Sequence, residues 1–209
     1  EKIAMKAAII AKKPDSLSHE AAAALALTGL TALVSVEDTI ELKPGETILI
    51  QGGAGGVASF AIQLAKHIGA RVISTASAGN VDYVKSLGAD QVIDYNAEDF
   101  TKVVSDVDAV FETVGGDVAL QSFSVIKPGG RAAFIASGGR APASPREDVR
   151  SLRPKVGRDR EHLERIVELY EAGAIRVPEI KTYALEQAAE AHRVSEGRHF
   201  RGKLVFVIK

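Results

Sequence analysis

The chain has no cysteine, and this absence excludes several kinds of site. Disulfides, thiolate nucleophiles and every zinc site with a cysteine ligand are ruled out. The lack of cysteine fits a reducing compartment, and we expect a cytoplasmic location. The five histidines are scattered, and none pairs at helical spacing with another ligand type in an apolar setting. The sequence therefore predicts no metal site.

Net charge and long apolar runs are equally scarce. The 209 residues carry 26 basic and 27 acidic side chains, a net charge of −1, so no basic field is available to hold nucleic acid. A basic stretch from Arg146 to Arg160 lacks interleaved aromatic residues, which favours a surface loop or edge strand. No run of eighteen apolar residues occurs, so we predict no membrane span. The P-loop and G-x-S-x-G patterns are also missing, which excludes P-loop NTPases and α/β-hydrolases.

A glycine-dense turn is the most informative feature that is present. The apolar run Ile48–Ile50 leads into it, and an amphipathic segment follows. Gly53, Gly55 and Ala58 fit the pattern G-x-G-x-x-A, in which the first glycine allows a tight turn and the second lets a pyrophosphate approach the backbone. The free N–H groups at the start of the following helix favour phosphate. We predict a dinucleotide site formed by Gly53, Ala54, Gly55, Gly56 and Val57.

Around this turn, strand-like and helix-like segments alternate. This rhythm is typical of βαβ units, so we predict an α/β fold with a doubly wound parallel sheet. Gly29 is expected to interrupt an Ala-rich helix that Ser18 caps, with 30–36 continuing as a second piece. The expected strands are 47–51, 71–75, 91–94, 109–113, 131–136, 149–156 and 204–208. The expected helices after the glycine turn are 56–67, 81–87, 97–104, 117–126, 160–172 and 185–195.

The residues after the second strand indicate which dinucleotide is bound. NAD sites place an acidic residue there to hold the ribose hydroxyls, but no acid occurs from Arg71 through Val81. The small polar groups of Thr75, Ser77 and Asn80 can instead donate to a 2′-phosphate. We therefore favour NADP(H) over NAD(H). The alternative is that these residues form an ordinary polar turn and helix cap.

Several motifs together resemble the medium-chain dehydrogenase/reductases, in their zinc-independent, quinone-oxidoreductase-like branch. The resemblance covers nearly the whole chain. It is carried by the segments 17–25, 28–32, 42–46, 53–57, 86–95, 114–116, 185–192 and 201–205.

The resemblance implies an NADPH-dependent reductase of quinones or activated C=C substrates (enones or enals), with a six-stranded Rossmann sheet. It implies that Thr31, Val114, Ala136 and Ser137 lie near the nicotinamide. It also implies that Ala54 to Val57 face the pyrophosphate, that Ser77 and Tyr95 lie at the phosphate end of the adenosine ribose, and that Lys203 lies near the cofactor. Residue by residue, plainer alternatives stay open: a helix hydroxyl bonded to its own backbone for Thr31, a surface ring for Tyr95 and a solvated charge for Lys203.

Two departures from the family pattern matter. Relatives often carry a basic residue near Gly79, where it can pair with the 2′-phosphate. Whole family members also begin with a GroES-like β-barrel domain, of which only a last strand within 3–12 is expected here. We divide the chain into 1–14 (remnant of that domain), 15–155 (core of the cofactor domain) and 156–209 (C-terminal helices and last strand). Leu27 stands where the zinc branch has a cysteine ligand.

No proton donor for catalysis stands out, so the catalytic residues stay unassigned. The alternatives are a relative of zinc-type alcohol dehydrogenases and a non-catalytic NADP(H)-binding module. A methyltransferase is disfavoured because it too expects an acid after the second strand. The resemblance further implies a homodimer paired through the edge strand near 149–156.

Overall fold

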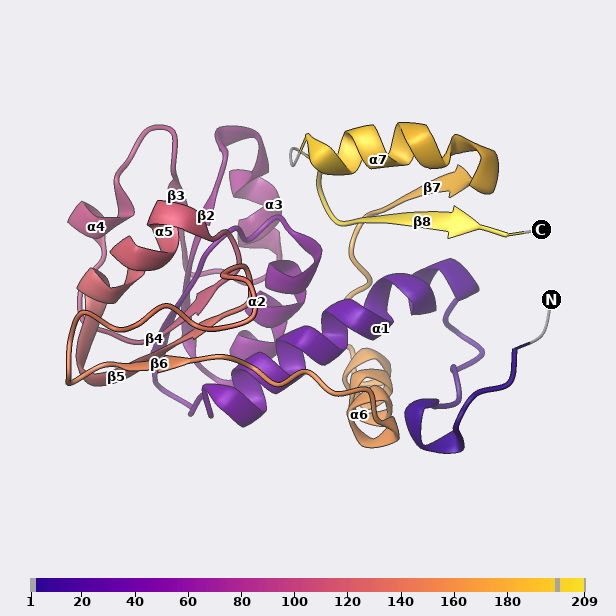
Figure 1. Cartoon of the computed structure of the whole chain (residues 1–209), viewed down its shortest axis with the longest axis horizontal. Helices are drawn as coiled ribbons and strands as arrows, with labels where there is room; N and C mark the ends of the chain where they lie inside the picture. Colours follow the sequence, from indigo (N-terminus) through magenta and orange to yellow (C-terminus); the bar gives the residue numbers. More distant parts are fainter. Residues whose placement is uncertain (1–2, 198–199, 209) are drawn as a thin grey trace.

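A six-stranded parallel sheet forms the centre of the molecule in the computed structural model, which describes residues 3–197 and 200–208 (Figure 1). Its spatial order is β3-β2-β1-β4-β5-β6, so the strand order reverses between β1 and β4 as in a Rossmann sheet. The predicted α/β fold is confirmed. The strands are β1 Thr47–Ile50, β2 Arg71–Ala76, β3 Gln91–Asp94, β4 Val107–Glu112, β5 Ile126–Phe134 and β6 Arg150–Leu152.

Helices cover both faces of this sheet, which explains why its strands are apolar without alternation. Ile48 and Ile50 of β1 face one core, and Leu49 between them faces the other. The first core includes side chains of α1, α2 and α6, and the second includes side chains of α4 and α5. The helices are α1 His19–Leu33, α2 Gly56–Ile68, α3 Val81–Ser86, α4 Phe100–Val103, α5 Gly116–Gln121, α6 Arg160–Glu171 and α7 Ala188–Glu196.

The expected break at Gly29 does not occur. Ser18 caps α1 as predicted, its hydroxyl accepting from the Ala21 N–H at 3.1 Å, but α1 then runs unbroken through Gly29 and continues as the π-helical turn η2 (Val34–Thr39). A Cβ at Gly29 would lie 2.6 Å from Ile166 Cδ1, so this glycine serves close packing of α1 on α6. Tertiary packing has overridden helix propensity here.

The same helix is apolar enough to pass a membrane-span criterion. His19–Thr39 qualifies by length and composition, although no run of eighteen apolar residues was found in the sequence. In the fold, 61% of its most apolar window is buried. The apolar character is accounted for by packing against other helices of the first core.

Several boundaries differ from those predicted. The helix expected over 97–104 is only α4, because Asp99 caps it and accepts from the Thr101 N–H. The strand expected over 149–156 is only β6, and Pro154 follows it without a backbone donor. The helix expected over 117–126 is α5 plus the 3-10 turn η4 (Ser122–Val125).

The C-terminal part forms a second, two-stranded sheet, at the upper right of Figure 1. The strand β7 (Ile180–Ala184), which was not predicted, pairs in parallel with β8 (Lys203–Val207). The last strand therefore does not join the six-stranded sheet. One isolated parallel bridge, between Gly55 and Gly202, links the C-terminal segment to the glycine turn.

The segment before α1 does not form the strand expected within 3–12. It contains the short 3-10 turn η1 (Ala7–Ile9) and lies against α6, where Arg160 donates to the carbonyls of Ala7 and Ile10 at 2.7 and 2.9 Å. A strand needs a hydrogen-bonded neighbour, and none lies beside this segment among the described residues.

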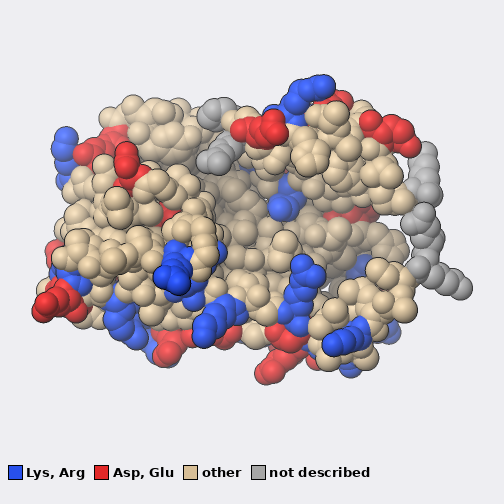
Figure 2. All heavy atoms as spheres, viewed as in Figure 1, with Lys and Arg blue, Asp and Glu red and all other residues tan. Residues whose placement is uncertain are grey.

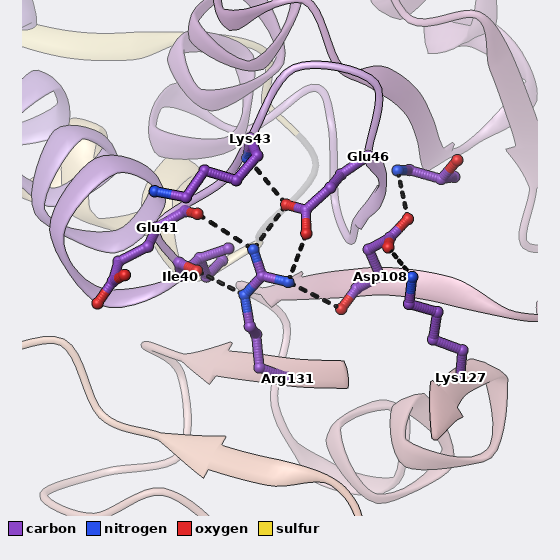
Figure 3. Close-up of polar contacts among 8 residues, drawn as sticks. Ile40, Glu41, Lys43, Glu46, Asp108, Lys127 and Arg131 are labelled. Atoms are coloured by element: carbon purple, nitrogen blue, oxygen red, sulfur yellow. Dashed lines mark hydrogen bonds and ion pairs between the residues drawn. The ribbon is translucent and has the colours of Figure 1, made fainter. Parts of the chain in front are cut away.

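A buried arginine connects residues near the amino-terminal ends of the central strands (Figure 3). The Arg131 guanidinium donates to both carboxylate oxygens of Glu46 at 2.6 and 3.0 Å and to the carbonyls of Ile40, Glu41 and Asp108. Burial alone would raise the pKa of Glu46, but the bonds from Arg131 and from the Lys43 N–H bring it below its usual value. These amino-terminal strand ends lie at the opposite side of the sheet from the carboxyl end of β1, which leads into the glycine turn.

A histidine latch, formed by His162 of α6 with Asp159 and with Asp38 of η2, makes the stability of the fold depend on pH. His162 Nδ1 and Nε2 each lie 2.8 Å from a carboxylate oxygen, of Asp159 and Asp38 respectively. Burial lowers the pKa of His162, but the two carboxylates outweigh it and raise the pKa above 6.5. The contribution of this latch is thus full below the unfolded pKa and is lost as pH rises through the folded pKa.

When the pH is raised from 6 to 8.5, we expect the urea concentration at the unfolding midpoint to decrease. The decrease should be larger in the parent chain than in His162→Gln. Equal decreases in the two proteins would contradict this assignment.

Candidate functional site

The glycine turn between β1 and α2 has the close contacts that its sequence predicts, with one correction. The left-handed backbone lies at Gly52 (φ 71°) rather than at Gly53. Gly53 is buried, and a Cβ there would lie 2.4 Å from Ser74 Oγ, so it serves close packing between the turn and β2. The tight-turn role therefore shifts by one residue.

The start of α2 is open to an incoming anion. Gly55 is its N-cap and supplies no side-chain cap, and Gly55 itself is exposed with ordinary dihedral angles. A Cβ at Gly55 would touch only the Gly52 carbonyl, at 3.3 Å. A Cβ at Gly56 would lie 2.5 Å from Lys203 Cδ, so the predicted Lys203 does lie against the turn. An N-terminal helix end beside a cation suits a phosphate.

The end of β2 supports the glycine turn through hydrogen bonds. Thr75 is buried; its hydroxyl accepts from the Gly52 N–H at 3.0 Å and donates to Gln51 Oε1 at 2.8 Å. Ser77 and Asn80 lie together, with Asn80 Nδ2 donating to Ser77 Oγ at 3.0 Å. Thr75 thus supports the turn, whereas Ser77 and Asn80 are partly accessible.

The ends of β4 and β5 form the other half of the site. Val114 is exposed, and a Cβ at Gly115 would lie 2.9 Å from the Ala136 carbonyl, so the predicted Val114 and Ala136 belong to one cluster. Ser137 follows and donates to the Arg140 carbonyl at 2.9 Å. These strand ends adjoin the reversal in strand order, where ligands bind in open α/β sheets.

Two predicted residues are less closely connected to this cluster. The Thr31 hydroxyl donates to the Leu27 carbonyl at 2.8 Å, within its own helix. Tyr95 is 52% exposed at the end of β3, and its N–H donates to the Ala76 carbonyl. The cofactor roles of both remain predictions.

Three residues of the site were missed. Gln51 and Glu112 end buried strands and are fully or almost fully buried; Glu112 Oε1 accepts from the N–H groups of Val114 and Gly115 at 2.6 and 2.7 Å. A polar residue closing an apolar strand was the signal that could have found them. Arg201 donates to Asn80 Oδ1 at 2.9 Å, and nothing local in the sequence indicates that contact.

The charge around the site is mixed. Acidic and basic side chains are interspersed over the face in Figure 2, which is hollowed between the part carrying α3, α4 and α5 and the unit of β7, β8 and α7. Burial raises the pKa of Tyr83, over whose ring Arg201 lies at 4.8 Å. Among the residues that the structure describes, no group of three or more His, Asp or Glu side chains is arranged to hold a metal.

Comparisons with known proteins bear on this site. A family model described as zinc-binding dehydrogenase matches residues 87–206. The chain is 42% identical over 133 residues to 2-methylene-furan-3-one reductase of Solanum lycopersicum, covering 62% of this chain and 33% of that protein. It is 31% identical over 209 residues to the chloroplastic NADPH-dependent alkenal/one oxidoreductase of Arabidopsis thaliana, covering 98% of this chain and 51% of that one.

A solved oxidoreductase structure has a similar fold. The quinone oxidoreductase from Coxiella burnetii superposes with a TM-score of 0.87 and 37% identity, over 95% of this chain and 64% of that chain. The chain thus spans between one third and just under two thirds of these three proteins.

Proposed function

This chain belongs to the medium-chain dehydrogenase/reductases, of which it is the cofactor-binding part, and from this premise we propose that it binds NADP(H). In this proposal the cofactor serves hydride transfer to an enone, an enal or a quinone. The observation that carries the proposal is the glycine turn between β1 and α2. It combines a backbone without obstructing side chains, an uncapped helix start and the Lys203 stem beside Gly56.

The residues present fit a nicotinamide dinucleotide with a 2′-phosphate. Gly55 leaves space against the backbone for a pyrophosphate, and the open side of Gly79 has no atom within 4 Å of an added Cβ. No acidic residue occurs from Arg71 through Val81, the segment that forms β2 and the loop after it, to repel a phosphate. These features support NADP(H) over NAD(H), as does the named cofactor of the Arabidopsis thaliana relative.

When bound, the reduced nicotinamide of NADPH would supply a hydride to the β-carbon of an enone or to a quinone and become NADP⁺, and the resulting enolate or phenolate would take up a proton. In this proposal, Val114, Ala136 and Ser137 border the nicotinamide end from the carboxyl ends of β4 and β5. Ser77, Asn80 and Tyr95 border the other end. The proton comes from solvent or from a part of the protein beyond this chain.

Titration of NADPH fluorescence with this chain tests the binding claim, and depletion of an enone or quinone tests turnover. We expect binding with poor turnover, because the chain spans only part of its relatives. The absence of binding at millimolar cofactor would refute the first claim. Turnover at the rate of a complete reductase would refute the second.

A zinc-type alcohol dehydrogenase is the second candidate, because the matched family model is described as zinc-binding. Metal analysis of the intact protein separates the two: stoichiometric zinc favours the dehydrogenase and its absence favours the reductase. A non-catalytic NADP(H)-binding module would bind cofactor without turnover even in the full-length protein. A cytoplasmic location remains a prediction.

We also propose a homodimer formed through β6. This strand lies at the edge of the six-stranded sheet, where its outer backbone groups can pair with a second copy. Light scattering that finds only monomers at high concentration would remove the proposal for this chain.

A further inference from the structure

The segment Arg201–Lys203 lies between the glycine turn and the loop after β2. The Gly202 N–H donates to the Ala54 carbonyl in the glycine turn at 3.2 Å, and the Lys203 N–H donates to the Glu179 carbonyl at 2.8 Å. Gly202 is left-handed (φ 73°), and a Cβ there would lie 2.1 Å from the Glu179 carbonyl oxygen. Only glycine fits, so the backbone of this segment is fixed between the turn and Glu179.

This fixed backbone delivers the Arg201 side chain to the loop after β2. Its guanidinium donates to Asn80 Oδ1 at 2.9 Å and to the Gly79 carbonyl at 3.1 Å, and it lies over the Tyr83 ring at 4.8 Å. The ring and the two acceptors hold the planar group in place. A cation therefore stands beside Gly79 although the loop itself contains no basic residue.

The same guanidinium also faces an acidic competitor. Arg201 Nη1 also donates to Glu179 Oε1 at 2.9 Å. In this ion pair the Arg201 side chain is 34% exposed and the Glu179 side chain 55%. A guanidinium has five N–H donors, and within the described part of the chain three of them have an acceptor. Arg201 thus retains donors for a phosphate, while the Glu179 carboxylate would repel it.

We propose that Arg201 is the residue that distinguishes NADP(H) from NAD(H) in this chain, and that Glu179 competes with the 2′-phosphate for it. The inference rests on the proposed function. It goes further by assigning the cofactor preference to an ion pair outside the loop after β2. NADP(H) binding then brings the 2′-phosphate to the guanidinium against the repulsion of the Glu179 carboxylate, whereas NAD(H) binding does not disturb the ion pair.

Dissociation constants of NADPH, NADH and 2′,5′-ADP, measured calorimetrically with this chain, test the inference. Arg201→Gln should weaken NADPH and 2′,5′-ADP by about tenfold or more, since charge-assisted hydrogen bonds are lost, and should change NADH less than about twofold. Glu179→Gln should tighten NADPH and 2′,5′-ADP several-fold and leave NADH unchanged. Glu186→Gln, an exposed glutamate before α7, is the matched control for the change in charge and should alter none of the three constants.

The outcomes separate this inference from the proposed function. If the parent chain binds neither NADPH nor NADH, the proposed function and the inference both fail. If it binds either cofactor and Arg201→Gln weakens both equally, Arg201 has a structural role and only the inference is overturned. A Glu179→Gln chain with an unchanged ratio of the NADPH and NADH constants removes the competitor role.

Discussion

Replacing Arg131 with alanine is expected to lower the free energy of unfolding by about 3 kcal/mol, the lower end of the range for breaking a buried ion pair. Arg131 is 7% exposed, and its partner Glu46 retains some access to water. The substitution would leave the Glu46 carboxylate without its bidentate partner. It would also leave the buried carbonyl of Ile40 without a donor.

The loss would extend to a strained turn. Glu41 has a left-handed backbone (φ 53°) that non-glycine residues rarely adopt, and Arg131 Nη2 donates to its carbonyl at 3.2 Å. Without this bond, the connection from η2 to β1 loses one of the contacts that hold it in that conformation. Figure 3 shows Arg131 between Glu41 at one end of this connection and Glu46 at the other.

Urea unfolding of Arg131→Ala, Arg131→Lys and the parent chain measures the effect, provided that the m-value is unchanged. Lysine retains the charge but not the two-pronged donor geometry, so we expect an intermediate stability. Arg158→Ala, at an exposed arginine between β6 and α6, is the matched control and should change the stability by less than about 0.5 kcal/mol. An Arg131→Ala chain that matches this control would contradict the structural role.

The parts of the fold that the sequence predicted are those whose signals are local. The glycine turn, the cap at Ser18 and the alternation of strands and helices each depend on residues within a few positions of one another. Gly69, the C-cap of α2, has a left-handed backbone (φ 95°), and a glycine after a helix is a local signal of the same kind. Such signals indicate the type of an element and its place along the chain.

What the sequence could not predict depends on contacts between distant residues. Gly29 reads as a helix breaker until Ile166 is seen to pack against it. The strand β7 is short and half exposed, and its pairing partner lies about twenty residues further along. Arg201 lies 121 residues beyond Asn80, and only the fold brings them into contact. Local propensity contains none of this information.

Gly55→Val is expected to weaken NADPH binding by about a hundredfold or more, which corresponds to at least ~2.8 kcal/mol. The candidate phosphate site lies at this residue, the N-cap of α2, where no side chain caps the helix start. A pyrophosphate can approach the backbone there only if no side chain projects from it. Valine would fill that space and keep the phosphates away from the helix start.

The same substitution should leave the fold intact, which makes it a sharper test than a change at Gly53. The dihedral angles of Gly55 (φ −71°, ψ 153°) suit any residue, and an added Cβ would approach only the Gly52 carbonyl oxygen, at 3.3 Å. We therefore expect a stability change of about 1 kcal/mol or less, comparable to a poor N-cap residue. At Gly53, by contrast, the added Cβ would lie 2.4 Å from buried Ser74 Oγ, so lost binding could reflect lost folding.

Gly157→Val provides the matched control, because Gly157 is exposed and its nearest neighbour to an added Cβ is Asp159 Oδ2 at 3.6 Å. That variant should bind NADPH like the parent chain. If Gly55→Val folds and also binds like the parent chain, the cofactor does not lie on this turn. Binding would then have to be sought away from the reversal in strand order, against the general rule for open α/β sheets.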